Sequence, residues 1–324
     1  MSKSLFPTRR GLMLGGAVAL ASGLAAYARR GRERAARIEA DNPPRGAFVD
    51  AAGLRVHYVE MGPRDAPPLV LLHGATGNLN DMTFDLAPRL ADRYRVICFD
   101  RPGLGHTERP AKDGHRPAVQ AAILRAAADR LGVVRPLVLG HSWGAAAALA
   151  WGLDAPEPPR GLVIVSAAAM PWGEGGPGLL SPLFTSRLAA HVGVEVLRLT
   201  AGGDEGASAA ARIFRPQPVP EGYMRHLQAE LILRPASLQA NTEDIQRLEP
   251  ELTAMAARYP DLRSPLAILH GEPDTITAAS IHSEGLHALA PDSTYEALPQ
   301  VGHMLHHAAP ETVAAAIDGL VSRT

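Results

Sequence analysis

From residue 46 onward, short apolar runs alternate with segments of helical periodicity. Two early runs alternate apolar and polar positions around a Gly-containing turn, which predicts an antiparallel hairpin of Ala47–Asp50 and Leu54–Glu60. The following runs are continuously apolar, as expected for strands buried on both faces: Pro68–Leu72, Arg95–Phe99, Pro136–Leu139, Gly161–Val165, Pro265–Leu269 and, more polar, a final strand at Ser293–Leu298. The pattern predicts an α/β fold, a mostly parallel central sheet covered by helices on both faces.

The helices expected between these strands cover Met82–Arg93, Pro117–Leu131, Ala145–Leu153 and Glu311–Val321. One interval, residues 171–248, contains no convincing strand, but has Gly/Pro-rich loops and amphipathic segments such as Glu221–Leu233. We interpret it as a helical cap inserted into a core of residues 45–170 plus 249–324. Because the insertion lies between two strands, it would sit at their carboxyl ends, where open α/β sheets bind ligands. The alternative is an incidental helical excursion.

Residues 1–44 differ from the rest of the chain. Lys3, Arg9 and Arg10 precede an uncharged, Gly- and Ala-rich stretch over residues 11–28, and five arginines follow it in a charged linker that ends at Pro43-Pro44. One interpretation is a cleaved export signal of a bacterial periplasmic protein, because Thr8–Leu12 is similar to a twin-arginine motif. The other is an uncleaved N-terminal anchor in the bacterial inner membrane. Arginines directly after the candidate cleavage site favour the anchor.

Composition excludes several classes of protein. Hydrophobic residues make up 46% of the chain and charged residues 20%, which suits a globular core, and a net charge of −1 predicts no nucleic-acid partner. The single cysteine, Cys98, excludes a disulfide framework or a cysteine zinc site, and its apolar surroundings predict a buried thiol. No set of His, Asp and Glu has metal-site spacing, and no glycine loop resembles a phosphate cradle, so we expect neither metal nor cofactor.

The motif Gly140-His141-Ser142-Trp143-Gly144 follows a predicted strand and precedes an Ala-rich helical segment. This is the context of a nucleophile elbow, in which a strained turn projects a serine hydroxyl above the sheet. Glycines at both ends of the motif let the strand and the helix approach closely. We therefore predict Ser142 as the nucleophile.

A developing oxyanion needs preorganised backbone N–H donors, each worth about 3 kcal/mol of transition-state stabilisation. Two positions are suited to supply them. Ala75 lies in the loop His73–Gly77, directly after a predicted strand, and Trp143 follows the nucleophile. We predict the N–H groups of Ala75 and Trp143 as the oxyanion hole.

An acid and a base are expected later in the chain. Asp274 follows the strand Pro265–Leu269, with Glu272 as a rival acid two residues earlier. His303 follows the final strand and is predicted as the general base and acid. Surface positions are expected for His306 and His307. Ordinary cap or surface positions are expected for the other histidines, such as His191 and His226.

Together these residues resemble the α/β-hydrolase superfamily over roughly residues 46–324, including the segment Phe99–Gly105. Within it the chain looks like small capped members: esterases, C–C bond hydrolases, cofactor-free haloperoxidase-like enzymes and proline iminopeptidases. Haloalkane dehalogenases and epoxide hydrolases look similar but use an aspartate where this chain has Ser142. The resemblance implies a Ser142–His303–Asp274 triad, an acyl-enzyme intermediate, and water activated by His303. A fold alone does not set the substrate.

Three functions are compatible with these residues. The first is hydrolysis of a small-molecule carboxylic ester or related acyl substrate. The second is C–C cleavage or aminopeptidase activity on the same triad, and for an aminopeptidase the substrate amine would need cap carboxylates such as Glu221, Glu230, Glu243 or Asp244. The third is a receptor-like protein with little turnover. Contact with a membrane through residues 11–28 is compatible with each.

Overall fold

The computed structural model describes residues 29–173 and 204–323, in two units, residues 1–43 and 44–324. In the first unit residues 29–41 form a helix, where the sequence predicted a charged linker. An ion pair one helical turn apart, Arg29 Nε to Glu33 Oε1 at 2.7 Å, supports it, and the helix ends just before Pro43-Pro44. The predicted membrane segment, residues 11–28, lies outside the described residues. Within the described part of the chain, no helix is long and apolar enough to cross a membrane.

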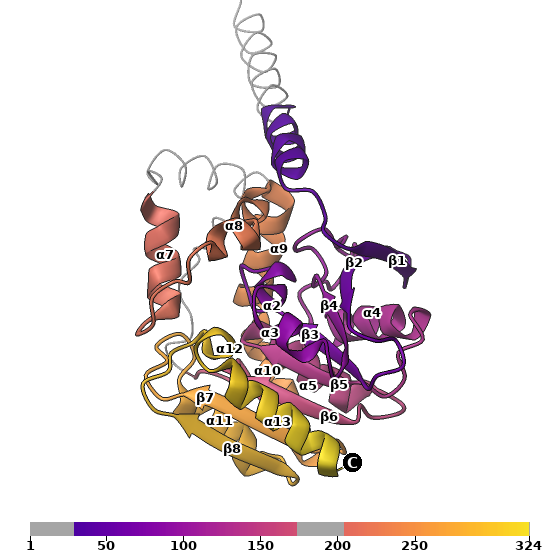
Figure 1. Cartoon of the computed structure of the whole chain (residues 1–324), viewed down its shortest axis with the longest axis vertical. Coiled ribbons are helices and arrows are strands. Elements are labelled where there is room, and N and C mark those ends of the chain that lie inside the picture. The colour runs from indigo at the N-terminus through magenta and orange to yellow at the C-terminus, as the bar shows by residue number, and fades with distance from the viewer. Residues whose placement is uncertain (1–28, 174–203, 324) are drawn as a thin grey trace, which may run out of the picture. The chain divides into compact units, whose positions relative to one another are not determined.

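The second unit is built on an eight-stranded sheet with strand order β1-β2-β4-β3-β5-β6-β7-β8 (Figure 1). Strands β1 and β2 form the predicted antiparallel hairpin, β2 pairs antiparallel with β4, and all other pairs are parallel. The strands are β1 Ala47–Ala51, β2 Leu54–Met61, β3 Pro68–Leu72, β4 Arg95–Phe99, β5 Leu137–His141, β6 Gly161–Val165, β7 Leu266–Gly271 and β8 Ser293–Leu298. The predicted fold class and strands are confirmed.

Helices cover both faces of the sheet, because alternate residues of each buried strand point to opposite sides. In β3, Val70 and Leu72 contact the cluster that includes α4 (Pro117–Arg130) and α5 (Trp143–Asp154). Leu69 and Leu71 contact the cluster that includes α3 (Leu86–Leu90) and α13 (Pro310–Arg323). Helix α11 (Ala279–Leu289) packs with the α4 and α5 layer through Leu286. The sheet is therefore the middle of three layers, as the apolar runs predict.

The helix predicted over Met82–Arg93 is instead two short helices, α2 (Asn80–Thr83) and α3. The backbone breaks at Asp85, which has φ −140° and ψ −48°. Pro88 explains the break, because it has no N–H to bond the carbonyl four residues earlier. All four residues of α2 are buried.

Between β6 and β7 the described residues contain helices and no strand. They form α7 Asp204–Phe214, α8 Tyr223–Leu227, η2 Ala229–Leu233, α9 Pro235–Gln246, α10 Leu248–Ala256 and η3 Tyr259–Asp261. The single helix predicted over Glu221–Leu233 is divided because Gln228 adopts a left-handed conformation, with φ 52°.

The turn between α8 and η2 contacts the loop after β3. Asn78 donates its amide N–H to Leu227 O at 2.7 Å, and Asn80 donates to Gln228 Oε1 at 2.9 Å. The inserted helices therefore contact the carboxyl edge of the sheet, where the candidate site lies (Figure 1). A cap with boundaries at residues 171 and 248 stays a prediction.

Candidate active site

Ser142 lies at the junction of β5 and α5, with φ 55° and ψ −121°. A non-glycine residue in such a region costs about 1–3 kcal/mol, and this strain is concentrated at functional sites. Two backbone hydrogen bonds hold the turn: Ser142 N–H donates to Val165 O at 3.0 Å, and Ser142 O accepts the N–H of Ala168 at 3.2 Å. The sharp strand–turn–helix geometry expected of the motif is present.

Three glycines allow backbone segments to converge on Ser142. A Cβ atom at Gly140 would lie 2.4 Å from Gly144 O, and a Cβ atom at Gly144 would lie 2.4 Å from Leu72 O. Both distances are far below van der Waals contact, so any side chain there would push the segments apart. A Cβ at Gly74 would lie 3.1 Å from Ser142 Cβ, so the loop after β3 lies directly against the serine.

The two predicted oxyanion donors belong to these converging segments. Trp143 is the first residue of α5. The N–H groups of a first helical turn have no partner within the helix and form the positive end of its dipole. The loop containing Ala75 is fixed on both sides. His73 Nδ1–H donates to Gly74 O at 2.8 Å, and Thr76 N–H donates to the Asn241 side chain of α9 at 2.6 Å. The use of these N–H groups as an oxyanion hole stays a prediction.

Asp274 and His303, in the loops after β7 and β8, are in direct contact. His303 Nδ1–H donates to Asp274 Oδ2 at 2.7 Å, while Asp274 Oδ1 accepts the N–H groups of Ile276 and Thr277 at 2.8 and 3.2 Å. Burial raises the pKa of Asp274, but hydrogen bonds from His270 and His303 outweigh it and hold the pKa well below its usual range. The carboxylate is therefore ionised at neutral pH. With Nδ1–H committed to it, neutral His303 has its lone pair on Nε2.

A further histidine, His270, supports the same carboxylate and was missed by the sequence reasoning. Its Nε2–H lies 3.1 Å from Asp274 Oδ2 and 2.8 Å from Thr277 O, and its Nδ1 lies 2.6 Å from Ser283 Oγ. A polar residue at the end of the apolar β7 run was the available signal. The rival acid Glu272 is exposed and has no part in this network.

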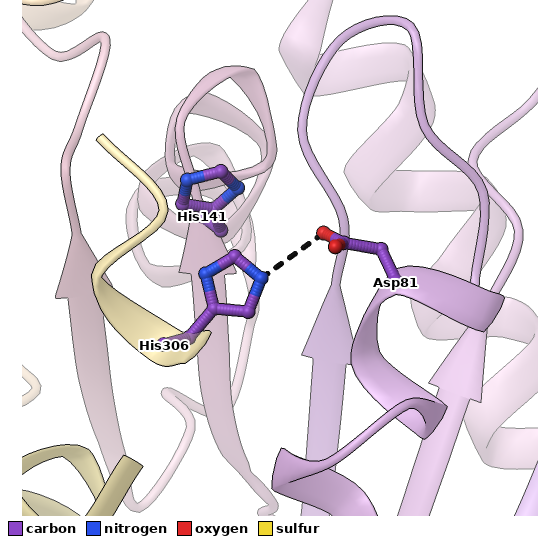
Figure 2. Close-up of side chains that lie close together, drawn as sticks. All are labelled: Asp81, His141 and His306. Carbon is purple, nitrogen blue, oxygen red and sulfur yellow. Dashed lines mark hydrogen bonds and ion pairs between the residues drawn. The ribbon is translucent and has the colours of Figure 1, made fainter. Parts of the chain in front are cut away.

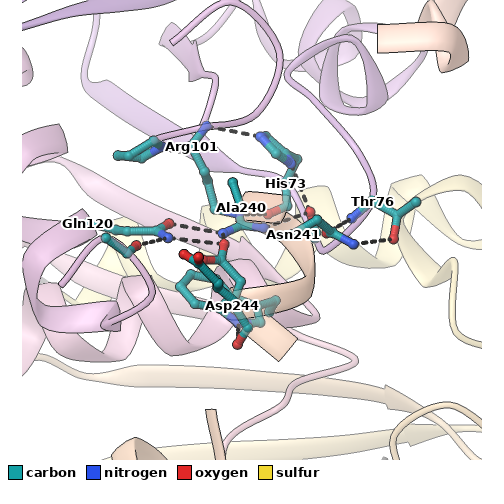
Figure 3. Close-up of polar contacts among 12 residues, drawn as sticks. His73, Thr76, Arg101, Gln120, Ala240, Asn241 and Asp244 are labelled. Atoms are coloured by element: carbon teal, nitrogen blue, oxygen red, sulfur yellow. Dashed lines mark hydrogen bonds and ion pairs between the residues drawn. The ribbon is translucent and has the colours of Figure 1, made fainter. Parts of the chain in front are cut away.

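A buried arginine fixes the loop of the predicted oxyanion donors (Figure 3). Arg101, with no exposed surface, donates Nε–H to His73 O at 2.9 Å and Nη2–H to Gly74 O at 3.2 Å. Its guanidinium also lies 4.0 Å from the centroid of the Trp143 ring, a cation–π contact. One side chain therefore contacts both of the segments that carry the predicted donors.

Asp244 of α9 balances the charge of Arg101. Its carboxylate accepts hydrogen bonds from Arg101 at 2.9 Å, Arg109 at 2.7 Å and Gln120 at 3.1 Å, and its backbone carbonyl accepts Trp143 Nε1–H at 3.0 Å. Asp244 was one of the four cap carboxylates named from the sequence as possible ligands for a substrate amine. Because the carboxylate is buried and already bound to two arginines, it is committed to this network instead.

A second buried cluster contains His141, the residue before Ser142, together with Asp81 and His306 (Figure 2). Asp81 of α2 accepts hydrogen bonds from His306 Nε2 at 3.1 Å, His307 Nε2 at 2.8 Å and Tyr223 Oη at 2.8 Å. The surface positions predicted for His306 and His307 are therefore wrong, since their side chains are 0% and 2% exposed. The Asp81 carboxylate makes their burial possible. The Nε2–H of His141 donates to His303 O at 3.0 Å, and its ring packs at a tilt against the His306 ring, with the two centroids 4.3 Å apart.

The cysteine and the other histidines named in the sequence analysis take no part in the predicted triad. Cys98 is a free, buried thiol on β4, as expected, and burial raises its pKa. His226 is partly buried, and its Nε2 lies 3.1 Å from Thr83 Oγ1 at the contact of α8 with α2. His191 lies outside the described residues.

Comparison with known proteins bears directly on this fold and site. The family model of the alpha/beta hydrolase fold matches residues 67–310, which include every predicted site residue. The chain belongs to the α/β-hydrolase fold family. Within this family it is 26% identical over 280 residues to haloalkane dehalogenase 2 of Mycobacterium tuberculosis, covering 85% of this chain and 94% of that one.

A second sequence relative and one solved structure of similar fold complete the comparison. RutD of Escherichia coli, a candidate carbamate hydrolase, is 29% identical over 260 residues, covering 80% of this chain and 92% of its own. The crystal structure of 2-hydroxy-6-oxo-6-phenylhexa-2,4-dienoate hydrolase from a Rhodococcus strain matches with a TM-score of 0.69 at 16% identity, over 85% of this chain and 99% of that one. The family and these relatives support an enzyme of the hydrolase class.

Proposed function

We propose that this α/β hydrolase cleaves a small-molecule carboxylic ester or related acyl compound through a triad of Ser142, His303 and Asp274. The strained backbone of Ser142 at the strand–helix junction is the observation that carries the proposal. This conformation costs free energy and has no structural benefit that a glycine would not supply better. A reacting hydroxyl held at the carboxyl edge of the sheet accounts for this strain.

The proposed first half-reaction is acyl transfer to the serine. His303 Nε2 accepts the proton of the Ser142 hydroxyl while Oγ attacks the acyl carbon, and the N–H groups of Ala75 and Trp143 stabilise the oxyanion. Asp274, held ionised by its surrounding donors, keeps the Nδ1–H of His303 in place and stabilises the imidazolium. The imidazolium then protonates the departing alcohol.

In the second half-reaction water replaces the alcohol. His303 removes a proton from the water, hydroxide attacks the acyl-enzyme carbonyl, and the proton returns to Ser142 as the acid product leaves. A carboxylate nucleophile, as the resemblance implies for haloalkane dehalogenases, would displace a halide instead. Serine at this position therefore favours acyl transfer, although a relative is named as a dehalogenase.

The experiment that tests the proposal is labelling of the full chain by a fluorophosphonate probe, followed by turnover of p-nitrophenyl esters of graded acyl length. We expect labelling and ester hydrolysis in the wild-type protein and neither in Ser142→Ala. Folded wild-type protein that does not react with the probe would contradict the proposal.

Ser166 provides a matched control. It is a fully buried serine with φ 46° that directly follows the neighbouring strand, β6. Ser166→Ala should retain labelling, because Ser166 lies in no predicted catalytic contact. Loss of labelling in both variants would point to disturbed folding rather than to a missing nucleophile, and thermal unfolding of both variants distinguishes these cases.

We also propose that residues 11–28 direct the chain to a bacterial membrane, as an uncleaved anchor or as a twin-arginine-like export signal. The support is the uncharged stretch between Arg9-Arg10 and the following arginines. Fractionation of cells expressing the full chain and an Arg9→Lys/Arg10→Lys variant tests this. An anchor keeps both proteins in the membrane fraction, and a twin-arginine signal loses export only in the variant. Soluble cytosolic protein in both cases contradicts the proposal.

A further inference from the structure

The buried cluster of Asp81, His141 and His306 contains imidazole nitrogens that no hydrogen bond explains. His141 Nε2–H donates to His303 O, so neutral His141 has its lone pair on Nδ1, and this nitrogen has no partner and no exposed surface. A buried acceptor without a partner costs about 1–3 kcal/mol. The Nδ1 atoms of His306 and His307 are likewise buried and unpartnered.

The free nitrogen of His141 faces a carboxylate and a second imidazole (Figure 2). One ligand atom each from Asp81, His141 and His306 lies within 4.8 Å of the others, and all three residues are buried. His141 Nε2 is turned toward His303, which leaves Nδ1 on the side of Asp81. A Cβ at Gly74 would lie 3.1 Å from this Nδ1 and 3.1 Å from Ser142 Cβ, so the nitrogen and the serine side chain both lie against Gly74.

We propose that Asp81, His141 and His306 bind a divalent transition-metal cation of the zinc type. Two imidazole nitrogens and a carboxylate oxygen are ligands that such ions prefer. Ligands of a tetrahedral zinc are separated by about 3.3 Å, given metal–ligand bonds of about 2.0–2.1 Å. The 3.1 Å between His306 Nε2 and Asp81 Oδ2 is close to that spacing, so little movement of this pair is needed.

The hydrogen bonds of the cluster can be rearranged to suit a cation, which binds imidazole in its neutral form. When the metal takes His306 Nε2, the ring proton moves to the unpartnered Nδ1, and no proton leaves the site. Asp81 supplies one negative charge, and its other oxygen keeps the hydrogen bonds from His307 and Tyr223.

The site would join the three segments on which the proposed chemistry depends. Asp81 follows the loop of Ala75, His141 precedes Ser142, and His306 follows His303. A cation bound to all three would hold these segments at fixed distances. Metal binding does not require Ser142 to be the nucleophile, so the metal site and the proposed function can be tested separately.

The test uses the full chain, freed of metal with a chelator and then titrated with Co²⁺ and Zn²⁺. We expect Co²⁺ to give visible d–d absorption bands that saturate at one ion per chain. We expect Zn²⁺ at a hundredfold excess over Kd to raise Tm by roughly 5 °C. His141→Gln and His306→Gln should lose both effects, while Ser142→Ala should retain them.

His307→Gln is the matched control, because His307 contacts Asp81 but is not in the proposed ligand set. It should retain the Co²⁺ bands and the Zn²⁺ shift in Tm. Circular dichroism of the metal-free variants establishes that each is folded. Wild-type protein without Co²⁺ bands and without a shift in Tm overturns the site and leaves a metal-free hydrogen-bonded cluster. Retention of both effects in folded His306→Gln overturns the ligand assignment.

Discussion

The ion pair between Asp244 and Arg101 provides a sharp test of how the inserted helices support the site. Both side chains have no exposed surface, and their atoms are 2.9 Å apart. In Asp244→Asn the side chain keeps its size but loses its charge, and one of its oxygens becomes an NH₂ group. The amide NH₂ of the new asparagine would face the N–H donors of Arg101 or Arg109, so at least one of these arginines would lose its hydrogen-bond acceptor.

The magnitude follows from the charge that stays behind. Burial lowers the pKa of Arg101 to about 10 although Asp244 opposes the shift, so the guanidinium is still charged at pH 7. Removing one partner of a buried ion pair costs about 3–5 kcal/mol, because the remaining charge is neither solvated nor paired. We expect the free energy of unfolding of Asp244→Asn to fall by about 4 kcal/mol.

Activity should fall as well, through the bonds from Arg101 to the carbonyls of His73 and Gly74. A shift of the Ala75 loop by a fraction of an ångström would move a predicted oxyanion donor, and such misplacements reduce turnover by about ten- to a hundredfold. The assays are urea unfolding followed by circular dichroism and steady-state ester hydrolysis, both at pH 7.

Glu243 is the matched control for this experiment. It precedes Asp244 on the same helix, is 25% exposed, and lies 3.4 Å from Arg109. Glu243→Gln should cost about 0–1 kcal/mol, since solvent screens exposed pairs. The reasoning is refuted if Asp244→Asn unfolds within 1 kcal/mol of the wild type, or if Glu243→Gln costs as much as Asp244→Asn.

Three further predictions concern neighbouring residues. Burial lowers the pKa of His73 to about 4, so between pH 6.5 and 4 this side chain is protonated in the unfolded chain but not in the folded one. The free energy of unfolding should therefore fall by up to about 3 kcal/mol from pH 6.5 to 4. The same dependence of unfolding free energy on pH in His73→Gln as in the wild type would contradict this. Gly144→Ala should lower the free energy of unfolding by at least about 1–3 kcal/mol and abolish probe labelling, because the new Cβ would lie 2.4 Å from a backbone carbonyl. Gly319→Ala is the control: its Cβ would meet open space, so its thermal unfolding should not show destabilisation. Asn241→Ala leaves the Thr76 N–H without its acceptor and should lower kcat for esters more than it raises KM; equal kinetic constants in variant and wild type would exclude a role in positioning the loop.

The sequence determined the sheet and the elements that carry the candidate site. β3, β4, β6 and β8 have the predicted bounds, and the other strands differ by one or two residues at one or both ends. The reason is local: a continuous apolar run bounded by turn residues suits only a strand buried on both faces. The same local rules identified the turn at Ser142 and the strand ends that present Asp274 and His303, because carboxyl ends of parallel strands share one edge of a sheet.

The tertiary structure alone decided which polar side chains are buried there. His306 follows His303 by three residues and lies in a segment where the sequence predicted a surface position. It is nevertheless fully buried, because the Asp81 carboxylate, 225 residues away, accepts a hydrogen bond from its ring. Arg101 and Asp244, 143 residues apart, likewise compensate each other. Burial of a polar group depends on the partner that satisfies it, and no local pattern encodes a partner so distant in the chain. The strands and the serine turn could therefore be predicted, while the buried charges and imidazoles around them could not.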